Sequence, residues 1–266
     1  LATPWQVLAI TFTNKAAGEL RERLVSAIGD EANDIWAYTF HSCCSRILRR
    51  FGEKIGYTNH FTIYDTDDSR RVMKQCQKQL GIEDKLINHK SILAEISRAK
   101  DSLVSPKEYK QTAQNDFRKS KIAECYELYQ SQLKKSDAMD FDDIIFNTVK
   151  LLEENEDVRD LYQTQFKYVM VDEYQDTNHA QYVLTSLLAD KYKNICVVGD
   201  DDQSIYRFRG ATIENIMRFK ERYEDEGLKV IQLELAENYR SKQNILDAAN
   251  SVISNNQSRL ADKRLR

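Results

Sequence analysis

The amino-acid sequence predicts an α/β fold with a parallel sheet, interrupted by an all-helical insertion. Short apolar runs alternate with stretches of helical periodicity at both ends of the 266-residue chain, and this alternation is typical of parallel sheets. Between residues 67 and 164 the pattern indicates helices and no convincing strand. Only eight Gly and two Pro occur, so few helices are expected to be interrupted.

The first part of the chain predicts three extended segments separated by two helices. The expected strands are residues 7–12 (VLAITF), 35–40 (IWAYTF) and 60–65 (HFTIYD). Residues 15–28 place small and aliphatic side chains on one helical stripe. A second helix, from residue 41, is expected to end at Gly52, because Gly is favoured after the last helical residue.

Helix start signals dominate the middle of the chain. Thr66 precedes two acidic residues and can cap a helix that ends at Gly81. Ser105 is followed by Pro and, three residues later, by Glu, which predicts the start of a long helix reaching to residue 133. Asp140 is expected to start another helix.

Alternation resumes near residue 165. The expected strands are 167–172, 194–200 and 229–235, and the helices between and after them are 179–191, 213–223 and 242–253. The predicted organisation is therefore a core made of residues 1–65 and 165–266, with a helical insertion at 66–164.

Composition favours a globular protein with reduced thiols. Hydrophobic residues make up 41% and charged residues 30%, a balance typical of soluble domains. Five Cys occur without a CxxC pair, which argues against a zinc site, and no secretory signal is visible, so we expect a cytoplasmic location. The sequence does not begin with Met, and we expect it to be part of a longer protein.

Charge is unevenly distributed although the net charge is only −3. Residues 70–135 contain 15 Lys and Arg against 8 Asp and Glu, whereas residues 137–160 contain 2 against 9. The basic stretch could face phosphates or could be an ordinary solvated helical surface, and charge alone does not decide between them.

Carboxylates gather where two expected strands end. Asp172, Glu173 and Asp176 follow one strand, and 200–202 (DDD) follow the next. Ligands in parallel sheets bind beyond the carboxyl ends of strands, and Mg²⁺ prefers carboxylates with water and phosphates. One carboxylate can hold the metal while the next activates a water, so the pattern predicts a metal–nucleotide hydrolysis site. The phosphate-binding loop GxxxxGK[ST] is absent, since no Gly precedes Lys.

Six motifs together resemble one family. They are AITFTNKAAGELRERL, TFHS, DFDDII, VDEYQDTN, GDDDQSIYRFRGA and ENYRS, and they occur in the order seen in UvrD/Rep/PcrA-type superfamily-one DNA helicases, with PcrA-like members most similar. The resemblance covers nearly the whole chain and implies a RecA-like P-loop NTPase core 1A, without its P-loop, and a helical domain 1B. The glutamine motif, the P-loop and the second motor domain are not in this sequence, which puts the activity of the piece alone in doubt.

The resemblance implies roles for individual residues. Asp172 would hold Mg²⁺ and Glu173 would be the general base. Gln203 would contact the γ-phosphate of ATP, Arg240 would stabilise charge on the transferring phosphoryl group, and Tyr239 would pack on the adenine.

A second set of residues would contact DNA. Aromatic and Arg side chains interleaved in a loop suit stacking on unpaired bases. The residues implied are Phe12, Thr13, Asn14, Thr39, His41, Tyr206, Phe208 and Arg209. The helical insertion would touch duplex DNA at single-strand/double-strand junctions.

The function implied is that of an ATP-dependent DNA helicase moving 3′ to 5′ on single-stranded DNA, in repair or replication. Alternatives are the helicase subunit of a RecB/AddA-like helicase–nuclease, a non-catalytic DNA-binding module with a decayed ATPase, and a metal nuclease. Asp172, Glu173, Gln203 and Arg240 are all present, which argues against the decayed module.

Overall fold

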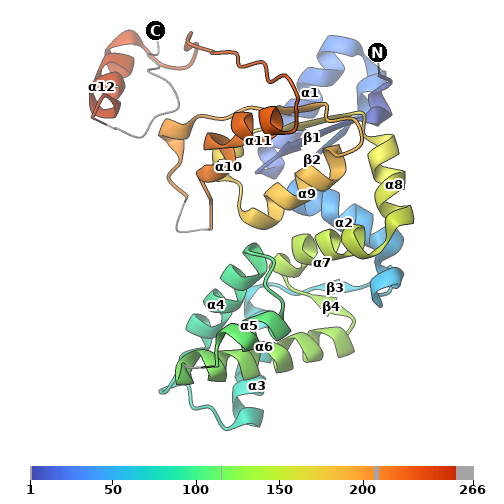
Figure 1. Cartoon of the computed structure of the whole chain (residues 1–266), viewed down its shortest axis with the longest axis vertical. Helices are drawn as coiled ribbons and strands as arrows, with labels where there is room; N and C mark the ends of the chain where they lie inside the picture. The colour runs from blue at the N-terminus through green and yellow to red at the C-terminus, as the bar shows by residue number, and fades with distance from the viewer. Residues whose placement is uncertain (1, 115, 207–209, 256–266) are drawn as a thin grey trace. The chain divides into compact units, whose positions relative to one another are not determined.

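The computed structural model describes residues 2–114, 116–206 and 210–255. The chain divides into two compact units. The first unit is Leu1–Asp172 with Asn178–Val198, and the second is Glu173–Thr177 with Gly199–Arg266. Figure 1 labels the helices of both units and strands β1 to β4.

The first unit contains a parallel sheet in the order β2-β1-β5-β6. Its strands are β1 (Val7–Thr11), β2 (Trp36–Thr39), β5 (Tyr168–Val171) and β6 (Ile195–Val197). The helices α1 (Asn14–Ile28), α2 (Phe40–Phe51), α7 (Phe141–Glu154), α8 (Glu156–Gln165) and α9 (His179–Ala189) belong to the same unit. The parallel α/β fold predicted from the alternation of apolar runs is confirmed.

The middle of the chain is mostly helical. It contains α3 (Thr66–Leu80), α4 (His89–Asp101), α5 (Pro106–Thr112) and α6 (Phe117–Lys135). A core of aliphatic, aromatic and Cys side chains, from Met73 to Ala138, lies between these helices. The two-residue strand β3 (Thr62–Ile63) lies within the extended segment predicted at 60–65. Its parallel partner β4 (Ala138–Met139) differs from expectation, since no strand was predicted between residues 67 and 164.

Capping explains where most of these helices begin. The side chains of Thr13, Thr39, Asn88, Ser105, Asp116, Asp140 and Asn178 each accept a hydrogen bond from a backbone N–H in the first turn of the helix that follows. The start predicted at Asp140 is confirmed. Asp65, not Thr66, caps α3, since its carboxylate accepts from two N–H groups. The long helix predicted from Ser105 is divided into α5 and α6.

The second unit contains short helices and an extended segment. Its helices are α10 (Glu214–Met217), α11 (Phe219–Asp225) and α12 (Gln243–Ile253). The strand predicted at 229–235 is absent from the described residues, and Ile231, Leu233 and Leu235 are 73–82% exposed there. Among the described residues, no helix has the length and apolar character that crossing a bilayer requires.

Candidate nucleotide and nucleic-acid site

The carboxyl ends of the sheet strands bring several predicted residues to one edge. Thr11 of β1 is in register with Thr39 of β2, and Ile10 is in register with Val171 of β5. The segments that follow these strands therefore leave the sheet side by side. The backbone N–H of Asp172 donates to the carbonyl of Ile10 over 2.9 Å, which continues the pairing to the predicted metal ligand.

Glu173, the predicted base, has an unusual backbone conformation. Its φ of 51° and ψ of 41° place it in the left-handed region, which non-glycine residues seldom occupy. A 3₁₀ turn, Tyr174–Asp176, follows directly. Residues held in this way cluster at functional sites, because the surrounding structure must impose the conformation.

Gln175 joins the two acidic motifs within the second unit. Its side chain is buried, and its Nε2 donates to Oε2 of Glu173 over 2.8 Å. Its Oε1 accepts from the backbone N–H of Asp200 over 3.0 Å. Asp200 in turn accepts from Nε2 of Gln203 over 2.8 Å. A continuous series of hydrogen bonds thus runs from the predicted base to the predicted γ-phosphate sensor.

Gly199 permits this close approach. A Cβ at this position would lie 2.6 Å from Oε1 of Gln175 and 2.8 Å from Cδ1 of Ile216. It would also lie 3.2 Å from the backbone nitrogen of Tyr174. The loop after β6 can pack on the turn after β5 only because residue 199 has no side chain.

The second unit also anchors the end of the turn that contains Gln175. Nδ2 of Asn215 donates to both the carbonyl and the hydroxyl oxygen of Thr177 over 3.0 Å. The backbone N–H of Thr212 donates to the same carbonyl over 2.9 Å. Thr177 and Asn215 are both buried, so the turn is held from two sides.

The oxygen ligands present fit a hard cation such as Mg²⁺. Oδ1 of Asp176 is buried and has no hydrogen-bond partner among the described residues, although buried polar atoms are usually paired. Burial and the neighbouring Glu173 raise the pKa of the Asp176 carboxyl, and a cation would relieve both effects. Carboxylate oxygens of Asp200, Asp201 and Asp202 also lie within 4.8 Å of one another.

Tyr239 and Arg240 lie on the surface of the second unit. Tyr239 is 93% exposed, and its hydroxyl donates to Glu237 over 3.0 Å. The backbone N–H of Arg240 donates to Oδ1 of Asn238 over 2.9 Å. These contacts are with sequence neighbours, and among the described residues no hydrogen bond or ion pair brings either side chain to Glu173 or Gln203.

The predicted DNA residues after β1 and β2 lie together in the first unit. The ring of Phe12 meets that of Phe40 edge-on, with centroids 5.5 Å apart. Thr13 and Thr39 cap α1 and α2 through their hydroxyl groups. Asn14 is exposed at the start of α1. The two threonines therefore position the helices. Thr39 is buried, whereas Thr13 and Asn14 are exposed and Phe12 is partly buried.

His41 stacks on a residue that the motif analysis did not single out for DNA. Its ring lies 3.6 Å from that of Phe141, with an interplanar angle of 19°. Burial lowers the pKa of His41 to about 4, so the imidazole is neutral near pH 7. Phe141 is 56% exposed and presents an aromatic face beside the predicted DNA residues.

Tyr206 lies in the second unit and is exposed, with 37% of its surface accessible. Phe208 and Arg209, its predicted partners, lie outside the described residues. Gln175, Gly199 and Phe141 are the site residues that sequence reasoning missed. All three fall inside the motifs already noted, but only the fold shows what each one touches.

The fold and these motifs define a helicase motor domain. Residues 1–224 match the model of the UvrD/REP helicase N-terminal domain, and the chain belongs to this family.

Similar relatives include three proteins named ATP-dependent DNA helicase PcrA. The relative from Leuconostoc citreum is 48% identical over 261 residues, which cover 98% of this chain and 34% of the relative. Those from Bacillus subtilis (strain 168) and Staphylococcus aureus (strain NCTC 8325) are 48% and 47% identical over 96% and 97% of this chain. The chain spans about a third of the length of these relatives (34% of each).

Proposed function

We propose that this chain is part of an ATP-dependent helicase that moves 3′ to 5′ on single-stranded DNA and unwinds duplexes. The observation that carries the proposal is the series of hydrogen bonds from Glu173 through Gln175 and Asp200 to Gln203. It connects a base suited to water activation with a neutral amide suited to phosphate sensing. Membership of the helicase family and the PcrA relatives support the same function.

The nucleotide would be ATP with Mg²⁺. Asp172 would hold the metal, and the bound metal would neutralise charge on the phosphate oxygens. Glu173 would accept a proton from the attacking water. Gln203 would contact the γ-phosphate. Arg240 and Tyr239 would reach the phosphoryl group and the adenine when the segment that contains them closes on the nucleotide.

Single-stranded DNA would contact aromatic residues of each unit. Phe12, His41, Phe141 and Tyr206 offer rings for bases to stack on, each worth roughly 1–3 kcal/mol. Thr13, Asn14 and Thr39 would contact the backbone, and Phe208 and Arg209 complete the set implied by the motifs. We place the protein in the cytoplasm, in DNA repair or replication.

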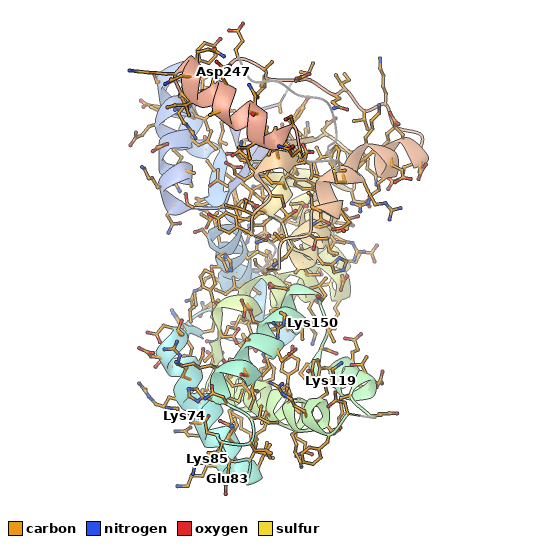
Figure 2. The ribbon with its side chains drawn as sticks, turned by 90° about the vertical axis from the view of Figure 1, so that its left-hand side faces the viewer. Lys74, Glu83, Lys85, Lys119, Lys150 and Asp247 are labelled. Atoms are coloured by element: carbon orange, nitrogen blue, oxygen red, sulfur yellow. The ribbon has the colours of Figure 1, made fainter. Side chains whose placement is uncertain are left out.

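We propose that residues 66–164 form a distinct helical domain that contacts duplex DNA at junctions, with 1–65 and 165–266 as the motor core. The separate hydrophobic core between α3 and α6 supports this division. Figure 2 shows Lys74, Lys85 and Lys119 on the outside of this part of the chain. Ammonium groups so placed suit phosphate contact.

The experiment compares DNA substrates with the whole protein that contains this chain. Duplexes with a single-stranded 3′ tail or 5′ tail of equal length are mixed with protein, Mg²⁺ and ATP. The proposal predicts strand separation of the 3′-tailed duplex alone, and phosphate release that single-stranded DNA stimulates. DNA cleavage with Mg²⁺ and no nucleotide would instead favour a nuclease, and equal unwinding of both substrates would contradict the 3′ to 5′ polarity.

A further inference from the structure

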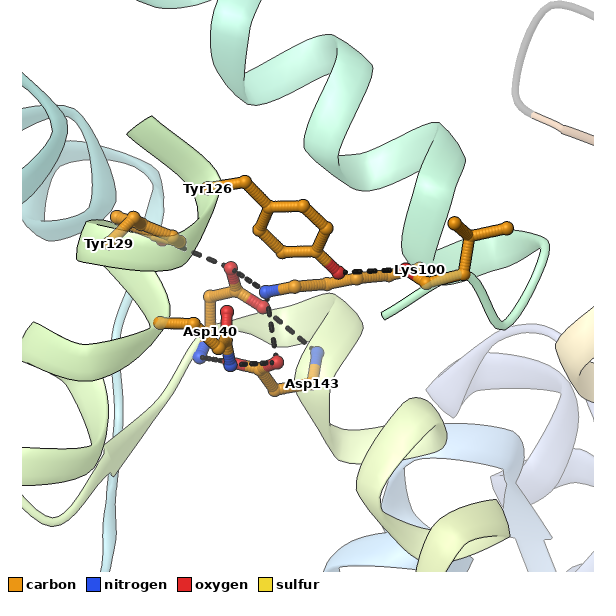
Figure 3. A network of polar contacts seen from close by, with 7 residues as sticks. Lys100, Tyr126, Tyr129, Asp140 and Asp143 are labelled. Atoms are coloured by element: carbon orange, nitrogen blue, oxygen red, sulfur yellow. Dashed lines mark hydrogen bonds and ion pairs between the residues drawn. The ribbon is translucent and has the colours of Figure 1, made fainter. Parts of the chain in front are cut away.

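Lys100 is a fully buried lysine near the end of α4. Only 1% of its surface is exposed, whereas lysines are almost never buried without a partner. Its Nζ lies 2.7 Å from Oδ2 of Asp140 and 2.9 Å from Oδ1 of Asp143 (Figure 3). Both carboxylates belong to the start of α7, so one ammonium group joins two helices of the first unit.

All four oxygens of these two carboxylates are hydrogen-bonded. Oδ2 of Asp140 also accepts from the hydroxyl of Tyr129 over 3.0 Å, and Oδ1 of Asp143 accepts from Nε2 of Gln130 over 2.7 Å. The remaining oxygen of each Asp accepts from the backbone N–H of the other. A buried ionic group satisfied to this degree defines one geometry.

The charges depend on one another. Burial opposes the charge on Lys100, but the two carboxylates outweigh it and raise the lysine pKa well above 10.5. Burial likewise opposes ionisation of Asp140, yet Lys100 holds the pKa of that carboxyl below its usual value. Loss of one partner from such a pair leaves an uncompensated buried charge.

Asp140 connects this cluster to the aromatic surface. It caps α7, and the next residue, Phe141, is the first of the helix. The Phe141 ring is more than half exposed, so burial in a core does not fix its position. The ring stacks on His41, one residue along the chain from the carboxylate that binds Lys100.

The end of α4 is itself anchored by the residue next to Lys100. Oδ1 of Asp101 accepts from Nδ2 of Asn178 over 2.6 Å. Asn178 caps α9 and is the last residue of the motif VDEYQDTN, which contains Glu173. Lys100 therefore projects from a helix end that is bonded to the start of α9 in the same unit.

We infer that Lys100 is a positioning residue for nucleic-acid binding: it holds the start of α7 so that Phe141 stacks on His41 and presents its free face to a DNA base. This inference rests on the proposed DNA-binding role of the two rings. It assigns Lys100 no contact with DNA.

The first test needs no DNA. The chain has four His, so ring-proton NMR signals of His41 can be assigned with the variant His41→Gln. In Phe141→Ala, these signals lose the shift caused by the stacked ring, and the pKa of His41 rises toward 6.5. Lys100→Met is expected to move the His41 signals in the same direction. Lys150→Met is the matched control, because Lys150 lies on α7 in an exposed pair with Glu154.

Lys100→Met leaves two buried carboxylates without a cation and could unfold the chain. A second variant therefore combines Lys100→Met with Asp140→Asn and Asp143→Asn. It removes every charge of the cluster and keeps a side chain that caps helices well. This variant is expected to retain the far-ultraviolet circular dichroism of the wild type and still to lose the His41 shift. Unchanged His41 signals in this folded variant would overturn the inference, whatever the affinity of the variant for DNA.

The second test measures affinity for an oligothymidine by fluorescence anisotropy in the whole protein. Phe141→Ala and the charge-free variant are each expected to weaken binding about tenfold, as loss of one stacked base predicts. Combined, they should weaken it no further, since both remove the same contact. Additive losses would contradict positioning through Phe141. Wild-type affinity in Phe141→Ala would overturn the proposed DNA role, while the NMR result would still decide what holds the ring.

Discussion

Gln175 and Glu173 are joined by a hydrogen bond of 2.8 Å, from the side-chain amide of the first to a carboxylate oxygen of the second. The amide oxygen of Gln175 is simultaneously occupied by the backbone N–H of Asp200. A buried amide with both ends engaged cannot rotate freely. Movement of the loop at Asp200 is therefore expected to shift the carboxylate of Glu173.

Replacement of the predicted base tests the chemistry. Glu173→Gln keeps the volume and an oxygen that can still accept from Gln175, but it cannot take a proton. ATP turnover by the whole protein should fall by at least about 100-fold, with ATP affinity nearly unchanged. Phosphate-release kinetics and equilibrium binding of a fluorescent ATP analogue measure the two quantities. Turnover within a few-fold of the wild type would show that another group is the base.

Gly199→Ala tests the close packing of the two motifs. The new methyl group would meet Oε1 of Gln175 and the side chain of Ile216 at less than 3.0 Å, so the loop must move away. We expect a lower unfolding temperature and a loss of DNA-stimulated ATPase.

Gly18→Ala is the matched control for this substitution. Gly18 lies within α1 with nothing within 4 Å of an added Cβ, so Ala should raise stability by up to about 1 kcal/mol. Thermal unfolding followed by circular dichroism compares the two. Equal effects of both substitutions would contradict the close-packing account.

Tyr206→Ala should weaken binding of single-stranded DNA by about 5- to 100-fold, as loss of one stacking surface predicts. Basal ATPase should persist, because the tyrosine is proposed to touch no phosphate. Tyr192→Ala is a control, since Tyr192 is similarly exposed at 36% and belongs to no motif. A parallel fall in basal ATPase and DNA affinity would indicate that Tyr206 supports the fold instead.

Asp101 predicts a pH dependence of stability. Burial and the neighbouring Asp142 raise its pKa to about 7. Between pH 4 and 7 the folded chain retains a proton that the unfolded chain has lost, so stability falls as the pH rises, by at most about 1.4 kcal/mol per pH unit. Asp101→Asn keeps an oxygen acceptor for Asn178 and cannot titrate.

Urea unfolding at pH 5 and pH 7.5 checks this dependence. The wild type should lose more stability between the two values than Asp101→Asn does. The contributions of all other titrating groups to the pH dependence are the same in both proteins and cancel in this comparison. The same loss in both proteins would mean that Asp101 ionises normally in the folded chain.

Local signals in the sequence were enough to predict much of the fold. Asp140 was predicted to start a helix and caps α7 with its own side chain, because a capping signal lies in the residues next to the helix start. Apolar runs predicted β1 and β5 because both are paired on each side within the sheet. The expected strand at 229–235 has a strand-like pattern, but a pattern forms a strand only where a neighbouring strand accepts its hydrogen bonds.

The sequence predicted many of the residues of the site, but few of the contacts between them. Glu173 and Gln203 were identified by their motifs. Gln175 bonds to Glu173 and to the backbone of Asp200, and nothing in the neighbouring sequence indicates these contacts. His41 and Phe141 are a hundred positions apart in the sequence, and their stacking depends on the packing of α2 against α7. Lys100 looked like one of many basic residues in a charged helical stretch, because burial of a single lysine depends on the tertiary structure.

Gln203→Ala in the whole protein tests the central claim most directly. The claim is that the hydrogen-bonded series from Glu173 to Gln203 couples hydrolysis to DNA. The measurement is the ATPase rate with and without single-stranded DNA, alongside unwinding of a 3′-tailed duplex. The account predicts that ATP and DNA still bind, while DNA no longer stimulates hydrolysis strongly and unwinding fails. Full stimulation with normal unwinding in this variant would contradict the account.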